Sequence, residues 1–505
     1  MGTQSALEVE RKYDFPPGVD LPDVAGVAGI AQVRALDDEE LDATYYDTPD
    51  LRLARAGTTL RRRTGGRDAG WHLKLQVGGD AREEVAHPAQ GGSTTVPAEL
   101  RALVRAQVRG GRVAPVVRLR THRAVRQLLD DDGRVLAELA DDRVTGELLD
   151  DAGGTTVWRE IEIELVAGGE ALLDVVGERL RATGAVPAGW PSKLARTLGD
   201  RLPGLFPPPL PARPTAGDVV LRHLRDQVSE LVSRDAGVRR DAPDAVHKMR
   251  VATRRLRSAL KTCRPVLDRG VTDPVRDELT QLASVLGEAR DAEVLRDRLR
   301  TAVAALPPEL VLGPARHRID DELLGRHREA HGRVVAELDG ARYLALLDSL
   351  DRLLDAPPWR PRAQRLAGKE LRHLVRRTWR TLQEAAAAAA AASTAEQRAQ
   401  LLHGVRKTAK QVRYAAEAAA EVLGQDVREL GERVEAVQVA LGEYQDSILA
   451  RTLLGELGAG AQLAGENGFT FGLLYGLESA RAERAEATYD QLWQVLAHER
   501  SRWLR

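Results

Sequence analysis

The chain has 505 residues, too many for one ordinary domain, so two or three domains are expected. Its 74 lysine and arginine residues are balanced by 75 aspartate and glutamate residues, and the formal net charge of −1 excludes a generic nucleic-acid-binding protein, so any anion site must be a local cluster. The single cysteine, Cys263, excludes an internal disulfide, which fits a reducing cytoplasm. Neither a signal peptide nor a run of about 18 apolar residues is found, so a cytoplasmic protein without a membrane span is expected.

Short stretches in which apolar and charged residues alternate occur throughout the first 200 residues, and this period of two predicts β-strands. The stretches are 7–12, 59–63, 71–77, 117–120, 135–139 and 158–165. One face of each predicted strand is charged, as it would be in a sheet curled into a barrel with a charged interior. The alternative is a half-buried sheet with an ordinary solvated face. A helix is predicted near residues 170–183, ending at Gly184.

Carboxylates stand on alternate residues in the first and the last of these stretches, so they share one face of each strand. They are Glu8 and Glu10, followed by Lys12, and Glu160, Glu162 and Glu164. Neighbouring like charges on one face are unfavourable unless something neutralises them. A divalent cation would do so, and ligands that are all oxygen favour Mg²⁺ or Mn²⁺ over zinc. The alternative for either stretch is an acidic strand that faces solvent.

Basic side chains share strand faces in the same way. The pairs are Arg61 with Arg63, His72 with Lys74 and Arg118 with Arg120, and Arg123 and Lys193 add further charge. Guanidinium groups bind phosphate oxygens with two parallel hydrogen bonds, while a lysine acts as a point charge. Carboxylates with a metal on one side and cations on the other predict a site for phosphoryl transfer, in which a positioned water attacks in line.

Six prolines lie between residues 201 and 214 and predict a stiff, extended spacer, which is the clearest domain boundary. After this spacer the apolar residues recur with the helical period. The predicted helices are 217–234, 244–263, 274–300, 317–338, 341–355, 364–392, 396–423, 426–457 and 469–500. They predict two packed bundles of about four long helices each, in repeats at about 215–355 and 364–505.

A basic motif occurs twice in the helical part, and a second block of sequence repeats at nearly the same spacing, which indicates an internal duplication. The second pair of blocks is 286–291 and 441–446, each beginning with Leu-Gly-Glu and ending with Asp. The basic residues of the two motifs are His247, Arg250, Arg254, Arg257 and Lys261, and His403, Arg406, Lys407, Lys410 and Arg413. Residues three or four apart share one helical face, so each motif forms a basic stripe.

Neither stripe contains an acidic residue, and like charges four residues apart cost about 0.2–0.5 kcal/mol per pair in an isolated helix. An anion, or acidic residues of another helix, would offset this cost, whereas the alternative is a solvated basic face. A duplicated cationic surface suits a repetitive polyanion. The two histidines are interpreted either as pH-dependent contacts to phosphate or as neutral donors buried between helices.

Residues 1–200 resemble the CYTH superfamily of triphosphate tunnel enzymes. The resemblance rests on an ordered set of motifs: ExExK at 8–12, Tyr-Tyr-Asp-Thr-Pro at 45–49, Gly-x-x-Leu-Arg-x-Arg at 57–63, Lys74, Ala-Glu-Leu-Ala-Asp at 137–141, Glu-Ile-Glu-Ile-Glu at 160–164 and Ser-Lys at 192–193. Residues 215–505 resemble a CHAD domain through the two basic helices and the two Leu-Gly-x-x-x-Asp blocks. Together the two resemblances cover nearly the whole chain, with residues 201–214 as the linker.

The resemblance implies an α+β protein of two domains. The first would be an eight-stranded antiparallel barrel that forms a triphosphate tunnel, and the second an all-helical domain of two pseudo-symmetric four-helix bundles that binds inorganic polyphosphate. The implied ligands of the metal, Mg²⁺ or Mn²⁺, are Glu8, Glu10, Glu162 and Glu164, assisted by Asp141 and Glu138. The implied phosphate contacts are Lys12, Arg61, Arg63, Lys74, Arg123 and Lys193, with Arg118 or Arg120 as further candidates. The implied catalytic residues are Glu8, Glu10, Lys12, Glu162 and Glu164, and the two basic stripes are the implied polyphosphate contacts.

Three functions remain open at this point. The first is metal-dependent hydrolysis of inorganic triphosphate in the tunnel, with the helical domain binding polyphosphate and so raising the local substrate concentration. The second is a non-catalytic protein that binds polyphosphate and associates with polyphosphate granules in the cytoplasm. The third is an adenylate cyclase or a thiamine or nucleoside triphosphatase. None of the three requires a membrane or a specific nucleic acid, and the sequence leaves the oligomeric state open.

Overall fold

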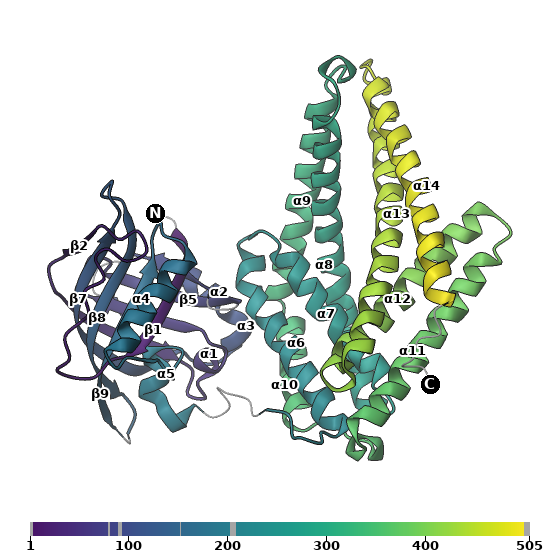
Figure 1. Ribbon diagram of the computed structural model, residues 1–505. Helices are drawn as coiled ribbons and strands as arrows, with labels where there is room; N and C mark the ends of the chain where they lie inside the picture. Colours follow the sequence, from purple (N-terminus) through teal and green to yellow (C-terminus); the bar gives the residue numbers. More distant parts are fainter. Residues whose placement is uncertain (1–3, 79–80, 89–92, 152, 203–208, 499–505) are drawn as a thin grey trace. The chain divides into compact units, whose positions relative to one another are not determined.

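The computed structural model describes residues 4–78, 81–88, 93–151, 153–202 and 209–498. The chain divides into two compact units, Met1–Pro208 and Pro209–Arg505 (Figure 1). The division falls within the proline-rich segment, of which residues 203–208 lie outside the described part. The first unit is built mainly of strands and the second of helices. No helix of the described residues is both long and apolar enough to cross a membrane.

The strands of the first unit contain each of the six stretches predicted from the sequence. They are β1 (Gln4–Asp14), β2 (Gln32–Ala35), β3 (Glu39–Asp47), β4 (Thr59–Thr64), β5 (Gly70–Gly78), β6 (Ala81–His87), β7 (Ala114–Leu129), β8 (Val135–Leu148), β9 (Thr155–Leu165) and β10 (Val186–Pro187). The helices are α1 (Arg52–Arg55), α2 (Ala98–Leu103), α3 (Arg105–Val108), α4 (Glu170–Ala182) and α5 (Lys193–Leu198). Helix α4 is the helix predicted near 170–183, while strands β2, β3, β6 and β10 were not predicted.

The strands close into a barrel. Their order is β1-β6-β5-β4-β3-β7-β8-β9, and β1 also pairs with β9, so eight of the described strands form one continuous antiparallel ring. Strand β2 extends this sheet beside β7, and β10 extends it beside β1. In the register, Glu10 lies opposite Glu164 and Lys12 lies opposite Glu162. Opposite residues project to the same face of a sheet, so these four charged side chains lie on one face. The closed ring of strands confirms the predicted eight-stranded antiparallel tunnel.

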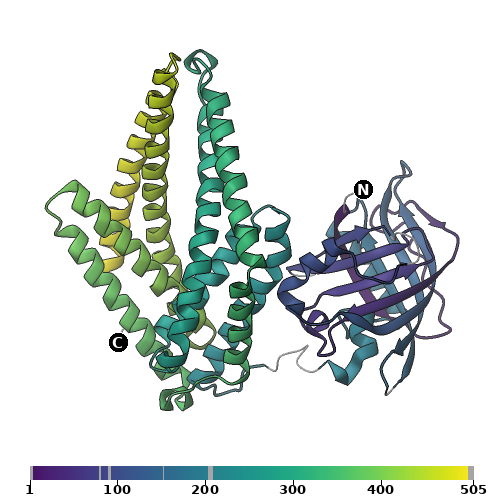
Figure 2. The ribbon, with the colours of Figure 1, turned by 180° about the vertical axis from the view of Figure 1, so that it is seen from behind.

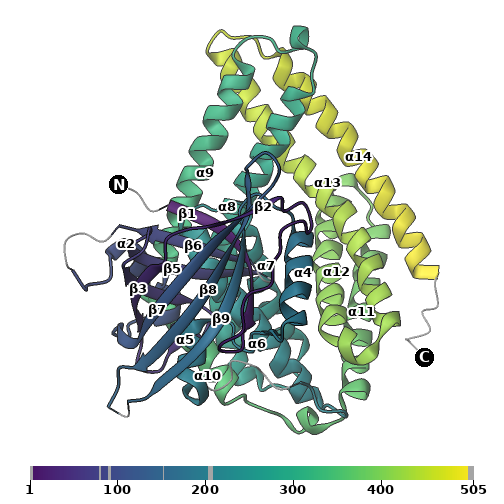
Figure 3. The same ribbon diagram turned by 60° about the vertical axis from the view of Figure 1, so that its left-hand side comes forward.

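The outer wall of the barrel is apolar where helix α4 lies along β1 and β9 (Figure 3). The core there includes Leu139, Ile161, Ile163, Leu173 and Val176. Burial of one such side chain stabilises the fold by about 1.5–3 kcal/mol. A second core joins α5 to the strands and includes Tyr45, Leu119, Trp158, Leu194 and Leu198. Because side chains alternate along a strand, the apolar residues packed against α4 on the outside leave the charged positions for the inside, whereas Tyr45 and Leu119 of the second core line the interior itself.

The second unit is all helical, and each of the nine predicted helices corresponds to a helix of the described residues. They are α6 (Ala216–Arg239), α7 (Ala245–Thr262), α8 (Arg269–Ala304), α9 (Ala315–Asp339), α10 (Ala341–Asp355), α11 (Ala367–Ala390), α12 (Ala395–Leu423), α13 (Gln425–Leu463) and α14 (Phe469–His498). The second repeat has the four helices expected, whereas the first has a fifth, the short α10. Its apolar face, with Tyr343 and Leu347 buried, packs against α8 and α9.

The two repeats pack through corresponding helices. Helix α6 contacts α11, α7 contacts α12, and α8 contacts α13, which is the pattern of a two-fold arrangement. The long pairs α8/α9 and α13/α14 extend away from the shorter helices (Figure 2). Leu299 and Leu323 of the first pair share one core with Leu453 and Phe471 of the second. This shared core makes the two repeats one packed unit.

Candidate functional site

Charged side chains from the surrounding strands line the interior of the barrel, around a cavity of about 100 Å³. The residues predicted from the sequence that line it are Glu10, Lys12, Arg61, Arg63, Lys74, Arg123, Glu162, Glu164 and Lys193. Asp68, Arg82 and Glu84 also line it. Glu8 lies in β1 opposite Arg82, and its side chain is outside the described residues. Charges in such an interior must neutralise one another, because an unpaired buried charge is strongly unfavourable.

Lys12 lies between the two acidic strands. Its Nζ is 3.1 Å from Oε1 of Glu10 and 2.7 Å from Oε1 of Glu162. Burial favours the protonated form of Glu162, but Lys12, Lys193 and Arg123 outweigh it and hold the pKa of this carboxyl well below its ordinary value. Glu162 therefore stays ionised inside the protein.

Glu164 is the least neutralised carboxylate of this group, and among the described residues no cation lies within ion-pair distance of it. Loss of solvation raises its pKa above the ordinary value, Lys74 counteracts this only in part, and Glu10 and Glu162 raise it further. Glu10, Glu162 and Glu164 thus present carboxylate oxygens from adjacent strands, and the carboxylate of Glu164 is not yet neutralised by a cation among the described residues. This set of oxygen donors fits Mg²⁺ or Mn²⁺.

Lys193 lies at the centre of a second acidic group. It is the first residue of α5, and its Nζ is 2.9 Å from Oδ2 of Asp142 and 2.7 Å from Oε1 of both Glu160 and Glu162. The three carboxylates are close enough to one another to hold a metal ion. The ammonium group of Lys193 already neutralises them, and in return they raise its pKa well above the ordinary value despite burial.

Arg123 connects the two acidic groups. Its Nε donates to Oδ1 of Asp142 at 2.7 Å, and its Nη2 donates to Oδ2 of Asp142 at 2.6 Å and to Oε2 of Glu162 at 2.7 Å. Arg61 Nη2 and Lys74 Nζ approach a third carboxylate, Glu84, at 3.7 Å and 3.1 Å. A phosphate oxygen could replace a carboxylate oxygen at each of these cations, because both acceptors suit the same donor geometry.

Three of the predicted residues lie on the outer face of the barrel, because side chains alternate along each strand. Asp141 accepts hydrogen bonds from Nε and Nη2 of Arg159 at 2.8 Å and 2.7 Å. Arg118 Nε donates to Oδ1 of Asp42 at 2.9 Å, and Arg120 is exposed. The inward positions of the same two strands carry the aspartate and arginine described above. Phosphate or metal in the cavity would therefore meet those side chains and not these three.

Glu138 is on the inner face, where its Oε1 accepts a hydrogen bond from Nε2 of Gln127 at 2.8 Å. Sequence reasoning did not assign Asp142 or Glu84 to the site, and it placed Glu160 on the acidic face of its strand without naming it among the implied ligands. The alternation of carboxylates in β9 was a sufficient signal for Glu160. Asp141 and Asp142 are adjacent aspartates, and only the pairing of β8 with β7 and β9 decides which of them faces the cavity. No local sequence pattern shows this pairing.

In the second unit, the two basic stripes meet where α7 packs against α12. Burial lowers the pKa of Arg250, Arg406 and Lys410 most, and Arg254 lies close enough there to lower the pKa of each of them further. Burial lowers the pKa of Lys410 to about 6, and Arg406, Arg254 and Arg250 lower it as well. These four residues, which we call the central basic cluster, therefore form one cationic site built from both repeats.

The two Leu-Gly-Glu blocks, 286–291 and 441–446, hold arginines of the two basic stripes in place. Arg250 lies against Gly287 of α8, where an added Cβ would come within 3.7 Å of its Nε, and its Nη2 is 3.6 Å from Oδ1 of Asp291. Arg406 lies in the same way against Gly442 of α13, where an added Cβ would be 3.2 Å from its Nη2. The aspartate that ends each block favours the charged form of its arginine. This arrangement explains why the two blocks are duplicated together.

Three guanidinium Nε atoms of the stripes are buried without an acceptor among the described residues, namely those of Arg254, Arg257 and Arg406. These donors are available to an acceptor supplied by a ligand. Arg413 differs, because its Nε donates to Oε1 of Glu417 at 2.7 Å and its Nη1 pairs with Glu435 at 2.8 Å. Neighbouring helices thus already neutralise this end of the second stripe.

The predicted histidines and lysines lie around the cluster. Burial lowers the pKa of both His247 and His403, and neighbouring cations lower it further. Both imidazoles are therefore mostly neutral at pH 7, which favours their interpretation as neutral hydrogen-bonding groups. Lys261 and Lys407 are exposed and add charge at the edge of the stripes.

Comparisons with known proteins agree with this division of the chain. A family model described as the CYTH domain matches residues 6–197, and one described as the CHAD domain matches residues 222–455. Two uncharacterized Mycobacterium tuberculosis proteins, MT2285 of strain CDC 1551 / Oshkosh and Rv2226 of strain ATCC 25618 / H37Rv, are each 41% identical over 493 residues. These matches cover 95% of this chain and 94% of each relative.

Two solved structures are similar to parts of the chain. The CHAD domain from the plant Ricinus communis is 22% identical and has a TM-score of 0.47, with 58% of this chain and 95% of that chain covered. A putative adenylyl cyclase from Hippeastrum, HpAC1, described as having a dominant triphosphatase activity, is 19% identical and has a TM-score of 0.25. That match covers 39% of this chain and 99% of the other.

Proposed function

Because the chain belongs to the CYTH family in residues 6–197 and to the CHAD family in residues 222–455, we propose that it hydrolyses inorganic triphosphate in its barrel and binds inorganic polyphosphate on its helical domain. A CYTH domain is typical of triphosphate tunnel metalloenzymes. The observation that carries the first half of the proposal is the barrel interior, which places a group of carboxylates beside lysine and arginine side chains in one small cavity.

The cations of the cavity bind and orient the substrate. Lys12, Arg61, Lys74, Arg123 and Lys193 come from different strands and from α5, so a linear triphosphate meets positive charge on several sides. Each cation exchanges a carboxylate partner for a phosphate oxygen, and the freed carboxylates become available to a metal ion. Fixing the phosphate chain in this way presents its terminal phosphorus to a water molecule in line with the bond that breaks.

Glu10, Glu162 and Glu164, with Glu8 two residues before Glu10 on β1, hold the metal in this proposal. A bound Mg²⁺ or Mn²⁺ stabilises the charge on the phosphate oxygens during transfer. The oxygen of the water forms a bond to the terminal phosphorus, the bond to the bridging oxygen breaks, and pyrophosphate leaves. The lysine and arginine side chains offset the negative charge that develops on the departing pyrophosphate.

Phosphate release tests the enzymatic proposal. We expect the wild-type protein with Mg²⁺ or Mn²⁺ to release phosphate from inorganic triphosphate, and Glu10→Gln to lower the rate by about 10²-fold or more, the scale of losing one preorganised electrostatic contact. Glu147→Gln, on the outer face of β8 and partly exposed, is the matched control and should keep the wild-type rate. Faster turnover of ATP would favour a cyclase or nucleoside triphosphatase. No release above Glu10→Gln from either substrate would leave polyphosphate binding as the function.

The central basic cluster is the proposed polyphosphate site. The support for this assignment is the pair of buried Nε donors of Arg254 and Arg406, which lack acceptors among the described residues and lie where both repeats meet. A charge-assisted hydrogen bond contributes about 1.5–3 kcal/mol, so replacing either arginine with glutamine should weaken binding at least tenfold. Arg413→Gln is the control, since glutamates already neutralise that side chain. Equal affinity of all three variants would refute this assignment.

A further inference from the structure

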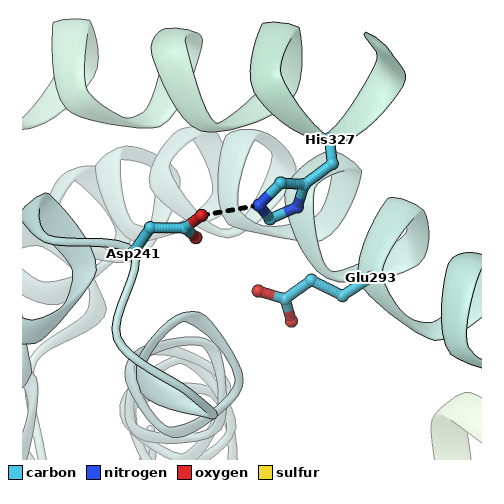
Figure 4. A group of neighbouring side chains, drawn as sticks. All are labelled: Asp241, Glu293 and His327. Carbon is cyan, nitrogen blue, oxygen red and sulfur yellow. Dashed lines mark hydrogen bonds and ion pairs between the residues drawn. The ribbon is translucent and has the colours of Figure 1, made fainter. Parts of the chain in front are cut away.

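Three side chains outside both proposed sites converge in the first helical repeat. Asp241 lies in the loop between α6 and α7, Glu293 on α8 and His327 on α9, and Figure 4 shows the three side chains pointing toward one another. One ligand atom from each lies within 4.8 Å of the other two. His327 Nε2 is 2.7 Å from Oδ2 of Asp241. One imidazole and two carboxylates from separate elements thus meet at one point.

The imidazole is well buried and only partly used. The side chain of His327 is 9% exposed, and its Nδ1 is buried without a hydrogen-bond partner among the described residues. A buried histidine in a purely structural role normally uses both ring nitrogens. Nε2 is the nitrogen that faces Asp241, so an ion bound at this site would replace the hydrogen bond between the two side chains, and Nδ1 would then carry the ring proton.

The two carboxylates keep free oxygens as well. Glu293 is 16% exposed, and within the described part of the chain only its Oε2 is engaged, by Nη1 of Arg290 at 3.0 Å. Asp241 is 44% exposed, so an ion can reach the group from solvent. His331, one turn after His327, has its Nε2 4.0 Å from Oδ1 of Asp241 and 2.7 Å from the carbonyl oxygen of Val238.

We propose that Asp241, Glu293 and His327 bind a divalent transition-metal ion, with Zn²⁺ as the best match. Zn²⁺ is commonly held by imidazole nitrogen together with carboxylate oxygen in four-coordinate centres. Three protein ligands leave a fourth position, which a water molecule can fill. The oxygen ligands of the barrel favour Mg²⁺ or Mn²⁺ instead, so the two sites differ in metal preference.

The bound ion would tie together three elements of the first repeat. Its ligands come from the loop that directly precedes α7, the helix of the first basic stripe, and from the two long helices α8 and α9. The ion would therefore fix the start of α7 against those helices. The alternative is a set of ion pairs without a metal, in which His327 pairs with Asp241 and Arg290 pairs with Glu293.

Zn²⁺ titration of the metal-stripped full-length protein distinguishes a metal site from a set of ion pairs without a metal. We expect the wild type to bind one more Zn²⁺ per chain than His327→Gln or Glu293→Gln, and Zn²⁺ to raise its melting temperature by more than theirs. His317→Gln is the matched control, because His317 forms a pair with Asp321 at 3.1 Å on the same helix but is 78% exposed. This control should behave like the wild type, and any Zn²⁺ taken up by the barrel is common to all four proteins.

The same titration can overturn the proposal. Equal Zn²⁺ stoichiometry and equal melting shifts in the wild type, His327→Gln and Glu293→Gln would show an ion-pair network. A loss of the extra Zn²⁺ in His317→Gln would place the ion at His317 and overturn the proposal as well. If His327→Gln does not fold, Glu293→Gln decides alone, because its amide keeps the size of the side chain. Neither triphosphate hydrolysis nor polyphosphate binding enters the readout, so this proposal stands or fails independently of the proposed function.

Discussion

The affinity of the central basic cluster for polyphosphate should fall as the pH rises above 6, because Lys410 must gain a proton before it can act as a cation. Burial is the main cause of its lowered pKa of about 6, and Arg406, Arg254 and Arg250 add to it while Asp446 opposes them. In the free protein at pH 8, only about 1% of the Lys410 side chains are charged. A bound polyanion supplies negative charge and so raises this pKa.

The magnitude follows from linkage between binding and protonation. If only the charged form of Lys410 binds, affinity falls up to about tenfold per pH unit between pH 6 and the pKa in the complex, and about one proton is taken up per site at pH 8. Lys410→Arg removes this dependence, because a guanidinium group stays charged throughout the range. The variant should bind more tightly than the wild type at pH 8 and about equally at pH 6.

Calorimetry in two buffers of different ionisation enthalpy measures the proton uptake directly. Polyphosphate is titrated at pH 8 into the wild type and into Lys410→Arg, and the apparent enthalpies give the number of protons taken up by each. The histidines near the cluster and the terminal phosphates contribute equally to both proteins, so the difference isolates Lys410. Equal uptake by the two proteins, or wild-type affinity that does not change between pH 7 and 9, would refute the reasoning.

Two further predictions concern positions where the structure distinguishes neighbouring or similar residues. Asp142→Asn should lower the rate of triphosphate hydrolysis by about tenfold or more, because Asp142 faces the cavity, whereas Asp141→Asn on the outer face should change the rate much less. Steady-state rates of the two variants, measured in parallel, check this prediction. A larger loss in Asp141→Asn than in Asp142→Asn would contradict the pairing register of β8. Gly442→Ala should weaken polyphosphate binding several-fold by displacing Arg406, since its Cβ would be 3.2 Å from Nη2. Gly455→Ala on the same helix meets no atom within 4 Å and should bind like the wild type in the same titration.

The regular elements could be predicted well where one periodicity dominates. Nine helical stretches and six strands were found because their apolar residues recur at 3.6 or at 2. Strand β3 was missed because both of its faces carry large side chains, with Tyr45 turned inward and Tyr46 outward. Strand β6 was missed because Glu83 and Glu84 are adjacent, which hides the alternation. A pattern with one charged face is visible in sequence, whereas a pattern with two similar faces is not.

The site residues divide in the same way. Glu10, Lys12, Glu162 and Glu164 could be predicted because each charged residue alternates with a residue of the outer wall. The sequence around Arg118, Arg120 and Asp141 has charged residues on both faces of the strand. Only the pairing with the next strand decides which of these side chains enters the cavity. The group of Asp241, Glu293 and His327 could not be predicted, since its members come from three elements and form no local motif.

The duplicated helical sequence carries a constraint that neither block shows alone. Cations at the contact of α7 and α12 repel one another, so the two helices would be pushed apart unless something held each arginine in place. The glycine of each Leu-Gly-Glu block lets one guanidinium lie against a helix, and the aspartate one turn later offsets its charge. Duplicating the basic motif without this second block would leave the central basic cluster without its support. The nearly neutral net charge of the whole chain is thus compatible with a strongly cationic centre, because the compensating acids lie on the helices behind it and leave its anion-facing donors free.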